Sequence, residues 1–356
     1  MATSNTTYII DTTIRASGRA FTVNPGVHDI VLYQADSVSD TVYWGEAGTA
    51  GERGIFINSG SGASAVYNVE IYGLKLVQNC LVAANLLPTF DLGTDAVRSG
   101  GGAHDVNFHD SYVRIHGRSA QAWHDEGGTY NITMRRIVWK NESNAFNDRC
   151  NLMYYAMVSS WNQNSRTYTG FQYHYKIVSC STIVANWLNY YLAGGGLKAV
   201  IDSNYIFVDA QNKYDPASDV CLGSAEQCYG LMVVGVSASY PGPGASALIR
   251  HNTFRSGTNW AGSEAASLGG AAIDTTENNA WWFYGNDVQT HKGNAGDGSE
   301  GYNSSCAIKV RQPGTNAVIR KTVIHSSADN DPATTSYTGW AEAIRIEALT
   351  NPVPKI

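Results

Sequence analysis

The segment QAWHDEGG, residues 121–128, carries side chains that can do proton chemistry. His124 can accept a proton near neutral pH, and the carboxylate of Glu126 can orient a histidine or bind a cation. Because successive residues of a β-strand face opposite ways, a strand that buries Trp123 presents His124 and Glu126 together. Asp125 then points inward and is predicted to be structural.

Two later segments, AFNDR at 145–149 and GFQYH at 170–174, also end in polar or charged residues. With the phenylalanine of the first segment inward, Asn147 and Arg149 face outward. With the phenylalanine of the second inward, Gln172 and His174 face outward. We predict that residues 122–126, 145–149 and 170–174 occupy three adjacent rungs of one sheet, in this order. Strands stack about 4.8 Å apart, so the six outward side chains are expected to form one patch about 10 Å long.

The chemistry that this patch favours is β-elimination on a uronate-containing polysaccharide. Arg149 would neutralise the carboxylate, which acidifies the C5 proton of the sugar, and His124 or His174 would remove that proton as general base. Glu126 either orients a histidine or binds a calcium ion together with Asn147, and the ion then neutralises the carboxylate. The predicted catalytic residues are therefore His124, Glu126, Arg149 and His174.

Further polar and cationic residues on the same predicted face extend the patch into a groove for an anionic polymer. Hydrolysis of the glycosidic bond is the alternative chemistry, and it needs two carboxyl groups across that bond. Glu126 would need Asp274 as its partner, and that residue lies several strands away, so elimination is favoured. The predicted substrate-binding residues are Arg98, Asn147, Gln172, Asp274, Lys309 and Arg311.

The composition limits the class of protein. The chain of 356 residues has 36 Gly, 21 Tyr and 9 Trp, and 15% of its residues are charged, against about 25% in ordinary domains. This composition favours many short strands over charged helices. The net charge of -6 disfavours nucleic acid as a partner, and no apolar run approaches the roughly 20 residues that span a membrane. The six cysteines leave buried thiols and disulfides both open, and Cys221 and Cys228 could close a small ring.

A six-residue pattern of apolar positions around a turn residue recurs along the chain. The turn residue is Asn204, Asn252 or Asn286 in three units and Ser or Thr in others, Ser181 among them. Asn suits a sharp bend because it tolerates the left-handed backbone conformation. An alternating strand precedes each unit, which gives the layout of a right-handed parallel β-helix with three strands per turn. The hairpin turns that a β-propeller needs are missing.

Long loops rich in Gly, Ser, Asn and Asp follow the Asn-type turns and are predicted to gather along one side of the solenoid. With these turns and loops, most of residues 60–347 resembles the pectate-lyase-like superfamily of β-helix proteins. The resemblance implies a substrate groove over the first sheet, on which residues 122–126 would lie. WHDE followed by FNDR is also similar to the Asp-Pro-His-acid strand of mannuronan C5-epimerases, with Ala122 and Trp123 in place of Asp and Pro.

We therefore predict a single all-β domain over residues 1–356, with capping coils in 1–60, regular coils in 61–347 and a tail in 348–356. The predicted function is binding and β-elimination of an acidic polysaccharide outside the cell or on a virion or cell surface, with calcium as the candidate cofactor. A glycoside hydrolase and a non-catalytic surface adhesin are the alternatives. A second outward row is predicted to be a solvated face, with His109, Arg135, Asp202, Arg250 and Arg320.

Overall fold

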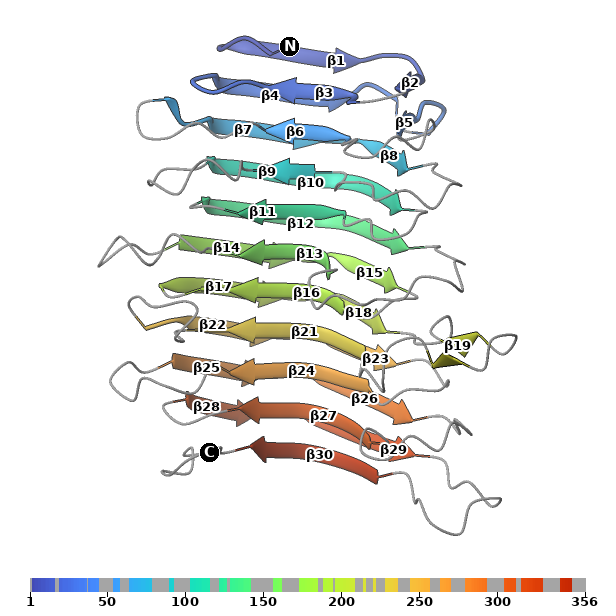
Figure 1. The fold of residues 1–356 in the computed structure, drawn as a ribbon, viewed down its shortest axis with the longest axis vertical. Coiled ribbons are helices and arrows are strands. Elements are labelled where there is room, and N and C mark those ends of the chain that lie inside the picture. The colour runs from blue at the N-terminus through green and yellow to red at the C-terminus, as the bar shows by residue number, and fades with distance from the viewer. Residues whose placement is uncertain are drawn as a thin grey trace.

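The computed structural model is built from β-strands stacked along one long axis, with the N-terminus at one end and the C-terminus at the other (Figure 1). In the part of the chain that it describes, no helix is long and apolar enough to cross a membrane. The described residues are 2–16, 19–36, 38–44, 54–57, 64–78, 90–92, 103–115, 122–126, 129–141, 156–161, 173–184, 188–194, 196–208, 214–215, 220–221, 228–235, 244–256, 263–269, 279–292, 304–311, 315–328 and 340–347.

Most strands belong to one 18-stranded sheet, called sheet A below, in which they form two columns. The first column consists of β1 (Thr6–Ile10), β4 (His28–Gln34), β7 (Tyr67–Tyr72), β10 (His104–Ile115), β12 (Tyr130–Asn141), β14 (Tyr173–Val178), β17 (Leu197–Asp202), β22 (Ser246–Arg250), β25 (Asn279–Tyr284) and β28 (Thr315–Arg320). The second column consists of β2 (Ile14–Ala16), β5 (Val42–Trp44), β8 (Lys75–Gln78), the later halves of β10 and β12, β15 (Ser181–Val184), β18 (Tyr205–Val208), β23 (Thr253–Ser256), β26 (Asp287–Lys292) and β29 (Val323–Ala328).

The other large sheet, sheet B, has 10 strands. They are β3 (Phe21–Val23), β6 (Ile55–Ile57), β9 (Phe90–Leu92), β11 (Trp123–Glu126), β13 (Ala156–Trp161), β16 (Leu188–Ala193), β21 (Cys228–Val234), β24 (Ser263–Gly269), β27 (Ser304–Arg311) and β30 (Trp340–Glu347). The described pairings within sheets A and B are parallel, and a separate antiparallel pair joins β19 (Tyr214–Asp215) to β20 (Val220–Cys221). The fold is thus an all-β parallel solenoid, which confirms the predicted class at this level.

The strands that were predicted to share the first sheet divide between the two sheets. Sheet B contains predicted strands near 122–126, 190–194 and 307–311, as β11, β16 and β27. The predicted neighbours of β11 are wrong, because β11 pairs with β9 and β13. His174, predicted to lie beside it, belongs to β14 of sheet A and pairs with β17. The predicted strands at 96–100, 145–149 and 272–276 lie outside the described residues.

Apolar side chains from both sheets fill the interior, because alternate residues of each strand point inward. Trp123 of β11 is fully buried, and its ring centroid lies 6.0 Å from that of Phe108 in sheet A. Phe108 also meets Trp139 edge to face at 5.7 Å. Tyr190 and Ile308 continue the core of sheet B with no exposed surface. Each such side chain contributes about 1.5–3 kcal/mol when it is removed from water.

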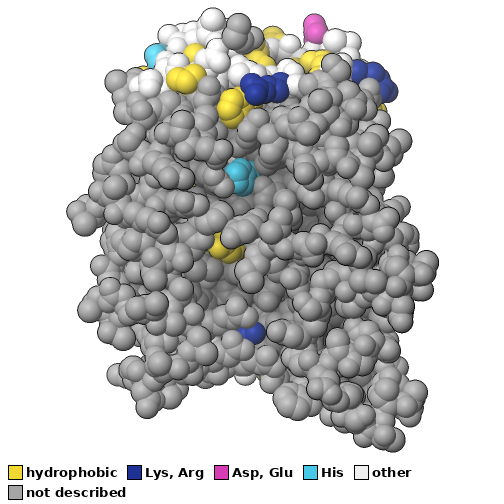
Figure 2. Space-filling view, viewed as in Figure 1, with side chains coloured by type: hydrophobic (Ala, Val, Ile, Leu, Met, Phe, Trp, Pro, Cys, Tyr) yellow, Lys and Arg dark blue, Asp and Glu magenta, His cyan; other side chains and the backbone are white. Residues whose placement is uncertain are grey.

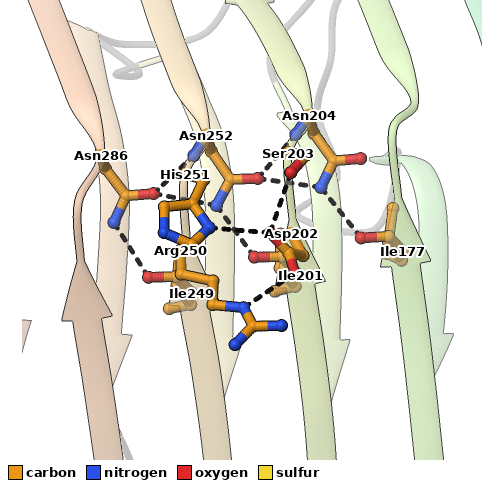
Figure 3. Close-up of polar contacts among 10 residues, drawn as sticks. All are labelled: Ile177, Ile201, Asp202, Ser203, Asn204, Ile249, Arg250, His251, Asn252 and Asn286. Carbon is orange, nitrogen blue, oxygen red and sulfur yellow. Dashed lines mark hydrogen bonds and ion pairs between the residues drawn. The ribbon is translucent and has the colours of Figure 1, made fainter.

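A ladder of buried asparagines joins three stacked bends of sheet A (Figure 3). Asn204, Asn252 and Asn286 are each at most 2% exposed. The side-chain nitrogen of Asn252 donates to the side-chain oxygen of Asn286 and to the carbonyl of Ile201, both at 2.9 Å. Its side-chain oxygen accepts hydrogen bonds from the backbone and side-chain nitrogens of Asn204, each at 2.9 Å. These bonds are what allow a polar amide to be buried.

The residue before each asparagine, and not the asparagine, takes the left-handed backbone conformation. The φ angles are 57° at Ser203, 53° at His251 and 62° at Gly285. The predicted reason for asparagine at this bend is therefore wrong, because side-chain hydrogen bonds select it instead. One coil earlier a buried cysteine, Cys180, takes the equivalent place, so the turn position predicted at Ser181 is one residue too late.

A second ladder, which sequence analysis missed, stands at the starts of β4, β7, β10 and β12. His-Asp and Tyr-Asn pairs alternate there, and the four rings stack with centroids 4.5 to 5.2 Å apart. Asp105 accepts a hydrogen bond from the side chain of Asn131 at 2.5 Å, and the Asp or Asn of each pair has a positive φ. The alternation is visible in the sequence as VHDI, VYNV, AHDV and TYNI, beginning at residues 27, 66, 103 and 129.

Candidate functional site

The strands of sheet B align one continuous row of residues at the register position of His124. His124 stands in this row because Trp123, the preceding residue of β11, is buried in the core, as predicted. The His124 side chain is partly exposed. From the N-terminal end, the row consists of Thr22, Phe56, Asp91, His124, Ser159, Tyr191, Met232, Ser267, Lys309 and Arg345.

The predicted site residues of this face are spread along the axis. Strands β13, β16, β21 and β24 separate β11 from β27. Lys309 therefore lies about 24 Å from His124, at about 4.8 Å per strand. Glu126 and Arg311 occupy a neighbouring row at the same spacing, and the structure describes their backbone but not their side chains. Only an extended ligand could contact residues at this spacing.

The predicted cluster on three adjacent rungs is not formed as expected. His174 is exposed on β14 of sheet A, so it does not stand beside His124. The register partners of His124 are Asp91 and Ser159. The remaining predicted residues lie outside the described part of the chain, and their roles stay predictions: Arg98, Asn147, Arg149, Gln172 and Asp274.

The burial of Lys309 and the outward position of Tyr191 differ from what the sequence indicates. Lys309 has an outward register position, yet it is only 4% exposed, and lysine is rarely so buried unless it is paired. Tyr191 shares the row of His124 and is partly exposed. Tyr191 was not among the predicted site residues. Its alternation with the buried Tyr190 and Leu192 was the available signal.

A metal centre is not assembled by the side chains that the structure describes, since no three His, Cys, Asp or Glu residues among them are placed to hold an ion. The calcium site predicted at Glu126 and Asn147 depends on side chains outside that part, so it stays a prediction. Figure 2 shows a histidine, an apolar side chain and a Lys or Arg at separate heights along the middle of the view, where the strands of sheet B cross in Figure 1.

No protein-family model matches the chain, and no curated protein matches it. Among solved structures, tailspike protein 3 of bacteriophage CBA120 is similar, with 8% identical residues and a TM-score of 0.25. The match covers 98% of this chain and 54% of that one, so this chain spans about half the length of the tailspike protein. Because this similarity is so low, it does not identify the fold. The fold is identified by the parallel pairing of the strands.

The outer face of sheet A carries a second continuous row, and the five residues that were predicted to share it do so. Sequence analysis missed the aromatic members of this row. Tyr33 stacks on Tyr72 and Tyr72 on His109, each with centroids 5.1 Å apart. In full, the row consists of Tyr33, Tyr72, His109, Arg135, Val178, Asp202, Arg250, Tyr284 and Arg320.

Acidic residues near this row are held by cationic partners. Arg136 donates two hydrogen bonds to the carboxylate of Asp110, from Nε and Nη2, both at 2.5 Å. The ring nitrogens of His109 lie 2.5 Å from Asp110 and 3.1 Å from Glu70. The hydrogen bond from Arg136 lowers the pKa of Asp110 from 3.8 to about 2, against partial burial that raises the pKa, and His109 adds to the lowering.

This contact is expected to make stability depend on pH in the acid range. The folded pKa of Asp110 lies below its unfolded value, so its contribution is present above about pH 4 and is lost as the pH falls through about 2. Urea unfolding should therefore show a destabilising effect of Asp110→Asn near neutral pH that shrinks at about pH 2. The shrinkage should be smaller in an Arg136→Gln background. An effect of Asp110→Asn that is equal at both pH values would contradict the prediction.

Proposed function

We propose that the solenoid is a right-handed β-helix with three strands per turn, and that it binds an extended acidic polysaccharide along the outer face of sheet B. The observation that carries this proposal is the register row of His124, most of whose members are polar or charged residue types, with Phe56 and Met232 as the apolar ones. His124 and Tyr191 are partly exposed in it, and Lys309 and Arg345 follow toward the C-terminal end. A row of this length suits a polymer that lies parallel to the solenoid axis.

We propose further that the bound polymer is cleaved by β-elimination, with His124 as the base. A neutral imidazole would take the C5 proton of a uronate, the C–H electrons would form the C4–C5 double bond, and the C4–O bond to the leaving sugar would break. A cation must neutralise the carboxylate so that the proton becomes acidic. Arg149, or calcium held by Glu126 and Asn147, is the proposed source of that charge. The protein would act outside the cell or on a virion or cell surface.

The test is ultraviolet absorbance of the unsaturated uronide while the protein is incubated with alginate, pectate and glycosaminoglycans, with and without calcium. His124→Ala is expected to lower the rate by about 10²- to 10⁴-fold, the usual contribution of a general base. Binding measured by affinity electrophoresis should stay within about twofold, since the base acts on the proton and supplies little binding energy. His174→Ala is the matched control, because this histidine lies on sheet A and its loss should leave the rate unchanged.

Each outcome separates the alternatives. No absorbance with any polymer would overturn elimination. Binding without any cleavage would then favour a non-catalytic adhesin. Release of reducing ends without absorbance would favour a glycoside hydrolase, which needs a second carboxyl group near Glu126. If none of the polymers binds, the polysaccharide proposal itself is wrong.

A further inference from the structure

An exposed aromatic pair stands on the outer face of sheet A, at β25. Trp282 is 44% exposed, and Tyr284, two residues along the strand, faces the same way and is partly exposed. Residues two apart on a strand are about 7 Å apart, so the two rings form one platform. Leu248 and Val318 flank Trp282 in its row, and Val318 is 37% exposed. Trp282 and Val318 thus leave neighbouring apolar side chains exposed, and contiguous exposed apolar surface is typical of binding sites.

Cationic side chains surround this platform. In the next row, Arg250 and Arg320 stand on either side of Tyr284, about 10 Å apart at about 4.8 Å per strand. Lys321 places its ammonium 5.4 Å from the centroid of the Tyr284 ring. Neither Arg320 nor Lys321 is paired with a carboxylate in the part of the chain that the structure describes. The platform therefore carries positive charge that the described residues do not fully neutralise.

One of the cations is already held in position. Arg250 donates from Nε to Asp202 at 2.7 Å, as Figure 3 shows, and its side chain is still 42% exposed. Among the described residues, Asp202 is the hydrogen-bond partner of this guanidinium, and neither terminal nitrogen bonds to another of them. Two terminal N–H groups in a fixed plane match the two oxygens of a carboxylate or the oxygens of a sulfate. His251, which also contacts Asp202 at 3.3 Å, lies at the edge of the platform.

We propose that Trp282, Tyr284, Arg250 and Arg320 form a binding site for an anionic saccharide, a uronate or a sulfated sugar. The sugar ring stacks on the aromatic pair, and its acidic group contacts the two arginines. This site lies on sheet A, away from the row of sheet B, and it does not depend on the function proposed for that row. Its role is to hold the polymer, since no described base stands over the platform other than the edge residue His251.

The test measures saccharide binding by calorimetry in a His124→Ala background, which prevents the proposed cleavage. The probes are an oligogalacturonate, a heparin oligosaccharide and a neutral dextran oligosaccharide. Trp282→Ala and Arg320→Ala are each expected to weaken binding of the anionic probe at one site by about tenfold. Dextran is expected not to bind, and added salt should weaken binding of the anionic probes.

The controls separate this site from sheet B and from self-association. Val323→Thr removes an apolar side chain that is 66% exposed on β29, in the second column of sheet A, and should leave binding unchanged. If sheet B also binds the probe, Trp282→Ala weakens one of two sites and leaves the other unchanged. If sheet B does not bind it, Trp282→Ala weakens the single site. Unchanged binding in both platform variants, or no binding of either anionic probe, would overturn the proposal. So would a Trp282→Ala variant that retains binding and converts an oligomer to a monomer in sedimentation, because the face would then be an interface between copies.

Discussion

Replacing Asn252 with alanine is expected to lower the free energy of unfolding by about 3–5 kcal/mol, because each buried group left without its partner costs about 1–3 kcal/mol. The amide of Asn252 is 1% exposed and connects three coils. Alanine would remove the hydrogen bonds of the Asn252 side chain to the carbonyl of Ile201, to the side-chain oxygen of Asn286 and from the two nitrogens of Asn204. Asn286 would keep the bond from the backbone nitrogen of residue 252, and the side-chain nitrogen of Asn204 would keep its bond to Ile177, so the backbone nitrogen of Asn204 loses most. Water cannot readily replace these bonds at so buried a bend.

Urea unfolding followed by circular dichroism measures this loss. Asn252→Asp replaces the donor nitrogen with a second oxygen, which faces the oxygens of Ile201 and Asn286. Near neutral pH it should destabilise at least as much as alanine, because repulsion and a buried charge add to the loss of these two bonds. Asn316→Ala, at an exposed position of β28, is the matched control and should change stability by less than about 0.5 kcal/mol. Because a solenoid is stabilised by contacts between neighbouring coils, the coils around Asn252 are expected to unfold first. A loss below about 1 kcal/mol would mean that the ladder does not determine the stability of these bends.

The asparagine ladder also shows how much of the fold can be predicted from local sequence. The recurrence of Asn204, Asn252 and Asn286 predicts a stacked bend and a parallel solenoid, and this is confirmed. The sequence does not indicate that Ser203 and His251 have the left-handed φ. Asparagine is selected at these bends by hydrogen bonds between neighbouring coils, and the sequence of one coil alone does not reveal such bonds. The alternation of His-Asp and Tyr-Asn pairs was not predicted. These pairs stand where a strand begins, and the inward-outward periodicity within a strand does not reveal them.

The candidate site was predicted well within a strand and poorly between strands. Alternation places Trp123 inside and His124 on the outer face, since that depends only on the geometry of one strand. The neighbour of β11 is β13, however, and its sequence AMVSSW has a serine, Ser160, at the register position of the buried Leu192. A polar residue there weakens the alternation, and the sequence therefore predicts strands at 145–149 and 170–174 instead of this one. The length of the intervening loop decides which strand stacks, and loop length has no local signal.

Trp123→Ala is the second substitution expected to have a large effect, with a loss of about 3–5 kcal/mol in the free energy of unfolding. Trp123 has no exposed surface and packs on Phe108, which in turn packs on Trp139, so this ring joins sheet B to sheet A. Alanine would leave a cavity between the two sheets that neighbouring coils can close only in part. Trp123→Phe retains an aromatic ring and should lose less than half as much stability.

The same substitution tests whether the core positions His124. At temperatures where Trp123→Ala is still folded by circular dichroism, cleavage or binding along sheet B should fall more than it does in Trp123→Phe. His124→Ala, by contrast, should reduce cleavage and change stability by less than about 0.5 kcal/mol, because its side chain is partly exposed. If Trp123→Ala is destabilised but keeps full activity while folded, the position of His124 does not depend on the buried ring beside it. The outer row of sheet B would then be held by the parallel strand pairing of β11 with β9 and β13 alone.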